Sequence, residues 1–346
     1  MIGELHPTPF HARTAACNRT NAWTTRSGFT VPVHYGDPAG EALAPRMSAA
    51  MIDISPLQDL RIHGPGAATM LEAACGASLR DLPSGRSEAV HWCADGGGLR
   101  GYGVVSRFGE QEFLLRGIDA DIGWFAAASP RFGATVEDVT ATRGLLLLSG
   151  VYALAALISA RLEVSALERN DHVGLDWNGV PVTVFRGTLG YEIACTPEDA
   201  VLLFDRVLRA GRLVDLRLAG EQAFHLLHLE AGLPMPHADF APARENLATT
   251  PLPSGLGFPD PEGDGGASGP VLAGLELEAE TPVSFVPVYA GTEEVGRTMR
   301  GLYSPALKSA VALAQLSPVC ARPGTLLSLR AAGAEIPARV VPLPFL

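Results

Sequence analysis

Residues 93–108 read CADGGGLRGYGVVSRF, and this stretch decides between two fold classes. Gly96, Gly98 and Gly101 fit the G-x-G-x-x-G pattern of a dinucleotide-binding loop. Such a loop needs a helix directly after it, because the pyrophosphate rests on the helix N-terminus. The residues after Gly101 are instead Tyr-Gly-Val-Val, and β-branched residues interrupted by glycine favour a strand. No Gly-Lys-Ser/Thr is present either. We therefore expect a turn between strands and no nucleotide site.

The composition indicates a folded protein without the charge that binds polyanions. Of 346 residues, 47% are hydrophobic and 18% are charged, and the formal net charge of −11 argues against nucleic acid and anionic membranes as partners. No apolar stretch approaches the ~20 residues that span a bilayer. Five scattered cysteines without C-x-x-C spacing favour a reducing cytoplasm. Because Lys308 is the single lysine, arginine side chains would hold any carboxylate ligand.

Helix-like and strand-like patterns are mixed along the chain, which predicts an α+β fold. We expect helices from Pro65 to about Leu79, over 196–211 and over about 218–231. We expect two strands separated near Pro56, a hairpin around Gly109 and a buried strand in LLLLSG. The stretch VPVTVFRGTLGYEIAC predicts a strand, a turn and a second strand. The segment PDPEGDGGASGP, residues 259–270, is typical of a linker or long loop. The predicted domains are therefore a region over 1–258 and a β-barrel domain over 271–346.

Five segments, in order, resemble the aminomethyltransferase family, the T-proteins of the glycine cleavage system. They are VPVHYG (31–36), MIDISPLQDLRIHGPGA (51–67), ADGGGLRGYGVVSRFGEQEFLL (94–115), HLEAGLP (228–234) and VGRTMRGLYSPALKSAVALAQL (295–316), with PLPF near the end. The resemblance implies a three-domain cloverleaf, in which two intertwined α+β domains surround a folate pocket and a β-barrel closes the chain. It also implies the transfer of one-carbon units to or from tetrahydrofolate.

The sequence departs from the family where the chemistry is expected. The family's acidic pair after the glycines falls on Arg100 and Gly101, although one of those carboxylates sits beside the reacting folate amine in the family. Thr188 stands where a glutamate grips the pterin ring, and Phe224 and His228 stand where arginines are expected. Ser55-Pro56-Leu57 replaces the family's Ser-His-Met. The scaffold is carried over, whereas the standard aminomethyl-transfer site is not.

Candidate site residues follow from these positions. We assign catalytic roles to Asp95 and Arg100, folate contacts to Leu57, Tyr102, Phe185, Arg186, Tyr191 and Glu192, and the donor pocket to His225, His228 and Tyr303. A guanidinium at Arg100 would depress the pKa of a neighbouring acid and could bind a substrate carboxylate. Glu192 could accept two hydrogen bonds from the amino-pyrimidine edge of a pterin.

Each assignment has a structural alternative. Asp95 could bond backbone amides as a turn residue, Glu192 could face solvent, and the aromatic residues could simply belong to the core. Glu221, His225 and His228 form a polar stripe on one predicted helix face, to which His237 or Glu230 could add a metal ligand. HLLH is not the metal-binding HExxH, however, and we expect no metal.

Three functions compete. The first is a tetrahydrofolate-dependent one-carbon transferase with a different small-molecule donor, such as a carboxylate-bearing methoxy-aromatic acid or a dimethylsulfoniopropionate-type compound. In that case a lipoyl carrier protein is not an expected partner. The second is a catalytically degenerate folate-binding or scaffold protein, although the KGCYxGQE segment of iron–sulfur assembly relatives is absent. The third is the same fold with another ligand, since fold alone does not decide function.

Overall fold

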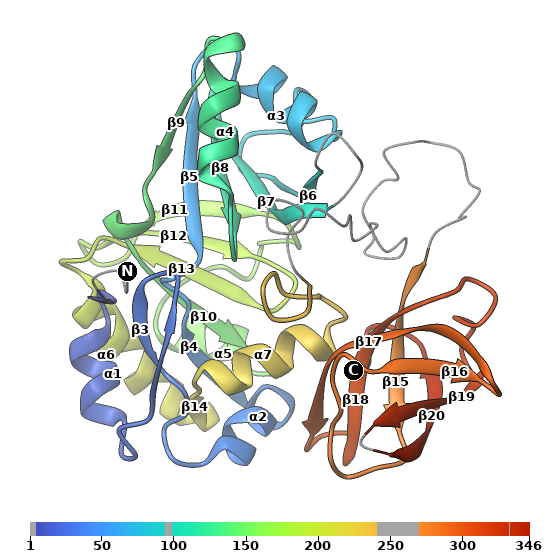
Figure 1. Ribbon diagram of the computed structural model, residues 1–346. Coiled ribbons are helices and arrows are strands. Elements are labelled where there is room, and N and C mark those ends of the chain that lie inside the picture. The colour runs from blue at the N-terminus through green and yellow to red at the C-terminus, as the bar shows by residue number, and fades with distance from the viewer. Residues whose placement is uncertain (1–4, 94–98, 241–269, 332) are drawn as a thin grey trace. The chain divides into compact units, whose positions relative to one another are not determined.

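The computed structural model describes residues 5–93, 99–240, 270–331 and 333–346. These residues form two compact units, each described here by itself. The first unit comprises Met1–Ala74, Ser78–Ala89 and Tyr102–His225. The second comprises Cys75–Ala77, Val90–Gly101 and Leu226–Leu346. Figure 1 shows the elements of both units.

A six-stranded sheet forms the centre of the first unit. Its order is β11 (His172–Asp176), β12 (Pro181–Arg186), β13 (Tyr191–Cys195), β10 (Gly144–Ser149), β4 (Ala49–Asp53) and β14 (Leu216–Leu218). All residues of β10 are buried, as its run of leucines predicts. The helices α1 (His11–Cys17), α2 (Pro38–Met47), α5 (Ala153–Ser159) and α6 (Ala200–Gly211) also belong to this unit. Leu157 of α5 and Leu203 of α6 share one core cluster with Leu146 of β10.

Two further sheets complete the α+β region. The first has the order β6 (Ser87–Cys93), β7 (Leu99–Gly109), β8 (Glu112–Gly117), β5 (Gln58–His63) and β9 (Thr135–Asp138). The second, of three strands, has the order β1 (His6–Pro7), β3 (Phe29–Pro32) and β2 (Trp23–Arg26). The remaining helices of the region are α3 (Ala67–Cys75), α4 (Ile122–Ala128), α7 (Glu221–Glu230), and the short 3-10 helices η1 (Ser129–Arg131), η2 (Thr140–Thr142) and η3 (Arg212–Val214).

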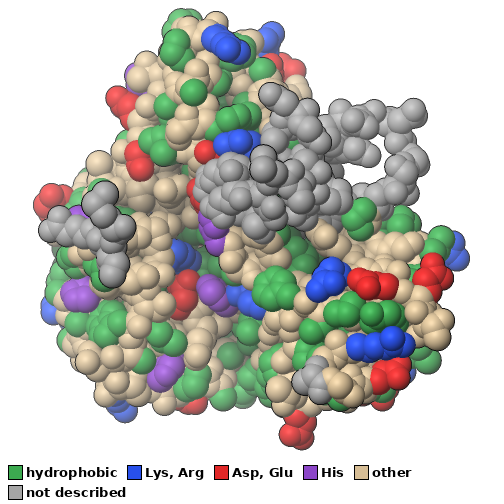
Figure 2. Space-filling view, in the orientation of Figure 1, with side chains coloured by type: hydrophobic (Ala, Val, Ile, Leu, Met, Phe, Trp, Pro, Cys, Tyr) green, Lys and Arg blue, Asp and Glu red, His purple; other side chains and the backbone are tan. Residues whose placement is uncertain are grey.

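The C-terminal part of the second unit is a closed six-stranded barrel. Its order is β15 (Val271–Leu277), β18 (Ser309–Leu316), β17 (Glu293–Ser304), β16 (Pro287–Ala290), β19 (Leu326–Ala331) and β20 (Ala334–Val341). Small residues of β18, among them Ala310 and Ala314, are fully buried and let the narrow barrel close. On the barrel face visible in Figure 2, basic and acidic side chains are interspersed.

The structure confirms the predicted fold class, an α+β region followed by a β-barrel. It also confirms the prediction that a strand, and not a helix, follows the glycine-rich stretch. Leu99 begins strand β7, and the segment after Gly101 continues as that strand, so no helix follows the glycines. The hairpin around Gly109, the strands on either side of Pro56 and the β12–β13 pair are confirmed as well. No described helix has the length and apolarity that a bilayer-spanning segment requires.

Three predicted helix boundaries are wrong. Helix α3 ends at Cys75 rather than Leu79, because Gly76 adopts φ +65°, a left-handed conformation that stops a helix. Helix α6 begins at Ala200, since the hydroxyl of Thr196 bonds Asp199 within a separate turn. Leu218 belongs to β14, which pairs in parallel with β4, and α7 starts only at Glu221.

Of the predicted linker, residues 259–269 lie outside the described residues. The predicted domain limits stay predictions, and strand β15 begins at Val271.

Candidate functional site

A buried guanidinium stands at the centre of the first unit. Arg116 of β8 donates from Nε and Nη2 to both oxygens of Asp59, at 2.7 and 2.8 Å. Its Nη1 donates to Glu192 Oε2 of β13 at 2.6 Å. The Arg116 side chain is 8% exposed and that of Asp59 is 2% exposed. Charge-assisted bonds of this bidentate geometry are the strong ones, so Arg116 links the side chains of β5, β8 and β13.

Arg143 completes this ion cluster, which we define as Arg116, Asp59, Arg143 and Glu192. Arg143 donates from Nε to Asp59 Oδ2 at 2.5 Å and from Nη2 to the carbonyl of Leu57 at 2.8 Å. Burial alone would raise the pKa of Asp59, but the two guanidinium charges outweigh it and lower that pKa from 3.8 to about 2. Leu57, predicted to contact folate, is 7% exposed and contributes this carbonyl to the cluster.

Aromatic rings cover the other side of Arg116. Its Cζ lies 4.4 Å from the ring centroid of Phe185, a cation–π contact. The imidazole of His172 stacks on the same phenyl ring at 5.3 Å, and Phe108 lies 4.5 Å from His172. Burial, and then the charge of Arg116, lowers the pKa of His172. Phe185 is 6% exposed, so the ring predicted to stack on a pterin already packs against two protein groups.

The β12–β13 hairpin presents the remaining predicted folate residues of the first unit. Arg186 donates from Nη1 to the carbonyl of Leu167, and its Cζ lies 5.6 Å from the ring of Tyr191. Tyr191 is buried, at 7% exposure. Glu192 differs, because its side chain is 22% exposed and Oε1 accepts no hydrogen bond from the described residues. Glu192 therefore offers a ligand a carboxylate oxygen that the described residues leave free.

In the second unit, the start of β7 is built around a glycine. A Cβ atom on Gly101 would lie 2.6 Å from Cζ2 of Trp92, whose side chain is fully buried. The position therefore cannot carry an acidic side chain unless the indole moves. Its neighbour Arg100 is half-buried. The predicted catalytic Asp95 lies outside the described residues. The half-buried Tyr102 follows in the same strand, within the first unit.

The histidines predicted for the donor pocket lie on α7. His225 Nε2 is 3.0 Å from Glu221 Oε1, and His228 is 7% exposed. Among the described residues, no group of three His, Cys, Asp or Glu side chains could hold a metal ion. Tyr303 on β17 is 42% exposed.

Glu230, at the end of α7, has a structural role. Its Oε1 accepts from Ser304 Oγ at 2.7 Å, and its carbonyl accepts from the Phe345 amide at 2.8 Å. Both contacts lie within the second unit and tie the end of α7 to residues of the barrel domain.

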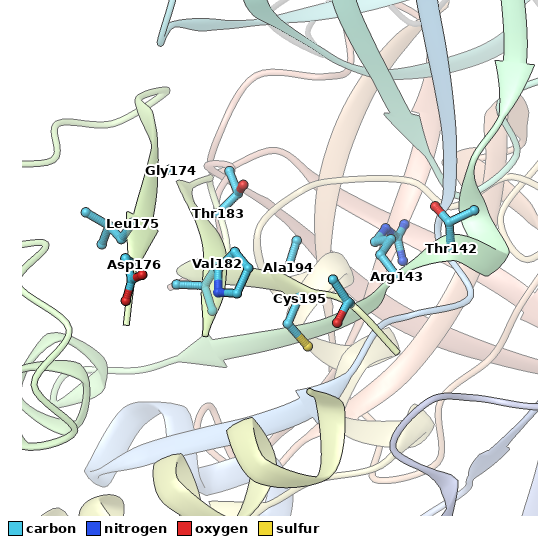
Figure 3. Close-up of a pocket in the computed structure, with 11 residues that line it drawn as sticks. Thr142, Arg143, Gly174, Leu175, Asp176, Val182, Thr183, Ala194 and Cys195 are labelled. Carbon is cyan, nitrogen blue, oxygen red and sulfur yellow. The ribbon is translucent and has the colours of Figure 1, made fainter. Parts of the chain in front are cut away.

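A groove of about 500 Å³ crosses strands β11, β12 and β13 of the first unit. Figure 3 shows Asp176 and Leu175 at one end and Arg143 and Thr142 at the other. None of the residues predicted from the sequence lines this groove. Arg143 is the cationic residue in this lining. Its guanidinium already donates to Asp59, so its charge is not available to a ligand in the groove.

Sequence reasoning missed Asp59, Arg116 and Arg143. A signal was present, because Asp59 in LQDLRI and Arg116 in FLLRG are charged residues inside apolar strands. A charge in such a position must be paired.

The comparisons with known proteins first define the class. The glycine cleavage system aminomethyltransferase T from Bartonella henselae superposes with a TM-score of 0.85, covering 99% of this chain and 98% of that one at 22% identity, which establishes a shared fold. Curated aminomethyltransferases from Saccharopolyspora erythraea and Streptomyces coelicolor are 28% and 29% identical over 98% and 99% of this chain, and over 97% and 98% of their own lengths.

Family models agree with this class. The GCVT N-terminal domain matches residues 11–259, and the glycine cleavage T-protein C-terminal barrel domain matches residues 271–346. The chain belongs to the glycine cleavage T-protein family and is a divergent member of it.

Asp59→Asn should destabilise the first unit strongly, because it removes the negative charge between two buried guanidinium groups. We expect a loss of about 3–5 kcal/mol in the free energy of unfolding, measured by urea denaturation. Glu112→Gln is the control, since Glu112 and Arg61 form an exposed pair at 2.9 Å and should contribute below about 1 kcal/mol. Equal losses for both variants would contradict the role given to the cluster.

Acid should destabilise the fold in two steps. The folded state lowers the pKa of His172, so below pH 6.5 the unfolded chain binds the proton first and stability falls. Asp59 contributes stability above pH 3.8 that is lost as the pH falls toward about 2. Denaturation midpoints of His172→Gln should depend less on pH between about 7 and about 5 than those of the wild type. Parallel pH profiles would exclude His172 as the cause.

Gly101→Ala should cost about 1–3 kcal/mol, because its methyl group overlaps the Trp92 ring. Gly123→Ala in α4 is the control, since nothing lies within 4 Å of its added methyl and it should leave stability unchanged or raise it. Thermal unfolding of both variants measures the difference. A Gly101→Ala variant as stable as wild type would show that the indole yields freely.

Proposed function

We propose that this chain is a tetrahydrofolate-dependent one-carbon transferase whose donor differs from that of the glycine cleavage reaction. Family membership across residues 11–259 and 271–346 supports the folate-dependent class. Tetrahydrofolate supplies the nucleophilic amine that accepts the one-carbon unit. The proposal for a different donor rests on the residues at the start of β7.

The pair Arg100–Gly101 is the observation that carries this proposal. The resemblance places two acids there, and this chain has a guanidinium and a glycine that Trp92 packs against. An arginine stays protonated and cannot act as a proton acceptor. It can instead bind a planar anion through two parallel hydrogen bonds. A small donor with a carboxylate, as in demethylation of a methoxy-aromatic acid, fits a cation at this position.

Glu192 is the residue proposed to hold the pterin. Its Oε2 is fixed by Arg116, which orients the carboxylate, and Oε1 accepts nothing from the described residues. A carboxylate held this way can accept hydrogen bonds from an amino-pyrimidine edge without reorganising. Glu192 would thereby take over the role of the family's pterin-binding glutamate, whose position is occupied by Thr188 in this chain.

The other assignments belong to the same proposal. His225, His228 and Tyr303 are proposed for the donor pocket, Asp95 for acid chemistry, and Tyr102 for contact with the folate. The protein would act in the cytoplasm without a lipoyl carrier protein.

A second candidate is a folate-binding protein without turnover. The absence of both acids at Arg100 and Gly101 favours it, because neither of these residues can act as a proton acceptor.

Glu192→Gln should weaken tetrahydrofolate binding about 10-fold or more, because an amide accepts from pterin N–H groups less strongly than a carboxylate. Isothermal titration calorimetry measures the dissociation constant, and Glu112→Gln is the matched control on an exposed strand residue. An unchanged constant for Glu192→Gln would remove this side chain from the pterin site.

A donor screen distinguishes the two candidate functions. Wild-type protein is incubated with tetrahydrofolate and a panel of methyl and aminomethyl donors, and mass spectrometry identifies the folate product. We expect a methylated folate from a carboxylate-bearing donor, and its loss in Arg100→Ala. Folate binding with no product from any donor would favour the protein without turnover, whereas product from an aminomethyl-lipoyl donor alone would contradict the altered-donor proposal.

A further inference from the structure

Arg26 is a buried arginine whose backbone is fixed by a tight hairpin. It ends β2 and pairs with Phe29 of β3 across the two-residue loop Ser27-Gly28. Both loop residues have positive φ, +48° and +81°, as a type I′ turn requires. The side chain is 8% exposed, and its Cζ lies 4.3 Å from the ring centroid of Phe224 on α7. The guanidinium is therefore held in one place before any ligand arrives.

The guanidinium of Arg26 makes one ion pair and no well-aligned hydrogen bond with the described residues. Nε, Nη1 and Nη2 are all buried without a hydrogen-bond partner in the described part of the chain. Nη2 forms a buried ion pair with Glu221 Oε2 at 3.1 Å, which leaves Nε and Nη1 without an acceptor among the described residues. A guanidinium remains charged at every physiological pH, so buried Nε and Nη1 donors without an acceptor destabilise the folded state. A residue kept at such a cost is a candidate for ligand binding.

Neighbouring acids do not supply acceptors for Nε and Nη1. The carboxylate of Asp53 uses Oδ2 for Thr8 Oγ1 at 2.5 Å and Oδ1 for Ser55, at 2.7 Å to its hydroxyl and 3.0 Å to its amide. Glu221 uses Oε1 for His225 Nε2 at 3.0 Å. The guanidinium is thus paired with a negative charge, but the described residues offer no oxygen or nitrogen acceptor to Nε and Nη1.

The negative charge of Glu221 decides which kind of ligand atom Arg26 can bind. A second carboxylate would arrive beside Glu221 Oε2 and meet like-charge repulsion. A neutral planar acceptor meets no such repulsion, and it can accept hydrogen bonds from Nε and Nη1 equally well. We propose that Arg26 is a ligand-binding residue that donates to a neutral acceptor, a carbonyl oxygen or ring nitrogen, on the folate. The inference rests on the proposed function and adds a contact on β2 to it.

Two parts of tetrahydrofolate carry such acceptors, the pterin ring and the benzamide carbonyl. Calorimetry with tetrahydrofolate, with 6-methyltetrahydropterin and with p-aminobenzoylglutamate separates them. Arg26→Met should weaken tetrahydrofolate binding about 10-fold or more and weaken binding of one fragment only. Arg26→Lys keeps the positive charge beside Glu221 but lacks the planar donors, so it should fold normally and show a similar loss.

Arg206→Met is the matched control, because Arg206 also stacks on an aromatic ring, with Cζ 5.2 Å from the Trp177 centroid. It should bind all three ligands as the wild type does. Wild-type affinity for tetrahydrofolate in both Arg26 variants, or an equal loss in Arg206→Met, would overturn the inference. A wild-type protein that binds none of the three would instead refute the proposed function, and the Arg26 contact with it.

Discussion

The pairing of Asp59 with two buried guanidinium groups is the constraint on which the first unit depends. Arg116 and Asp59 lie on neighbouring strands β8 and β5 of one sheet, and Glu192 lies on β13 of the other. A buried arginine cannot shed its charge, so each partner must be in place for the others to be tolerated. Arg116 also orients Glu192, whose Oε1 accepts no hydrogen bond from the described residues. Stability and the proposed ligand contact therefore share a single network.

Much of the fold follows from local patterns. Alternation in YGVVSRFGEQEFLLRG is sufficient to predict the β7–β8 hairpin, and the leucine run is sufficient for β10. Strand β14 is different, because three residues are too few to show an alternating pattern. Its parallel partner β4 lies 167 positions earlier in the chain, since Leu216 pairs with Ala49. The start of α6 was misplaced for a related reason, since Thr196 and Asp199 are both good caps and only the tertiary setting selects one.

The site is less predictable than the fold. Glu192 could be singled out from the sequence, but its orienting partner Arg116 could not, because an ion pair between distant strands leaves no spacing rule. Phe185 could be located on a strand from the sequence, but its role could not be predicted. An aromatic residue on a strand is equally suited to stacking on a ligand and to packing in the core. Here its ring contacts Arg116 and His172. Arg26 was not predicted at all, because only the structure shows that Nε and Nη1 have no acceptor among the described residues.

This family member retains the fold while its sequence differs from the family pattern at positions where site residues are expected. Arg100 introduces a positive charge where acids are expected, and Phe224, in place of an expected arginine, supports the guanidinium of Arg26. The thermal unfolding midpoint of the wild type, measured against increasing tetrahydrofolate, tests the central claim most directly. The account predicts a midpoint that rises with the logarithm of ligand concentration once binding saturates. A midpoint that stays constant up to millimolar tetrahydrofolate would contradict it.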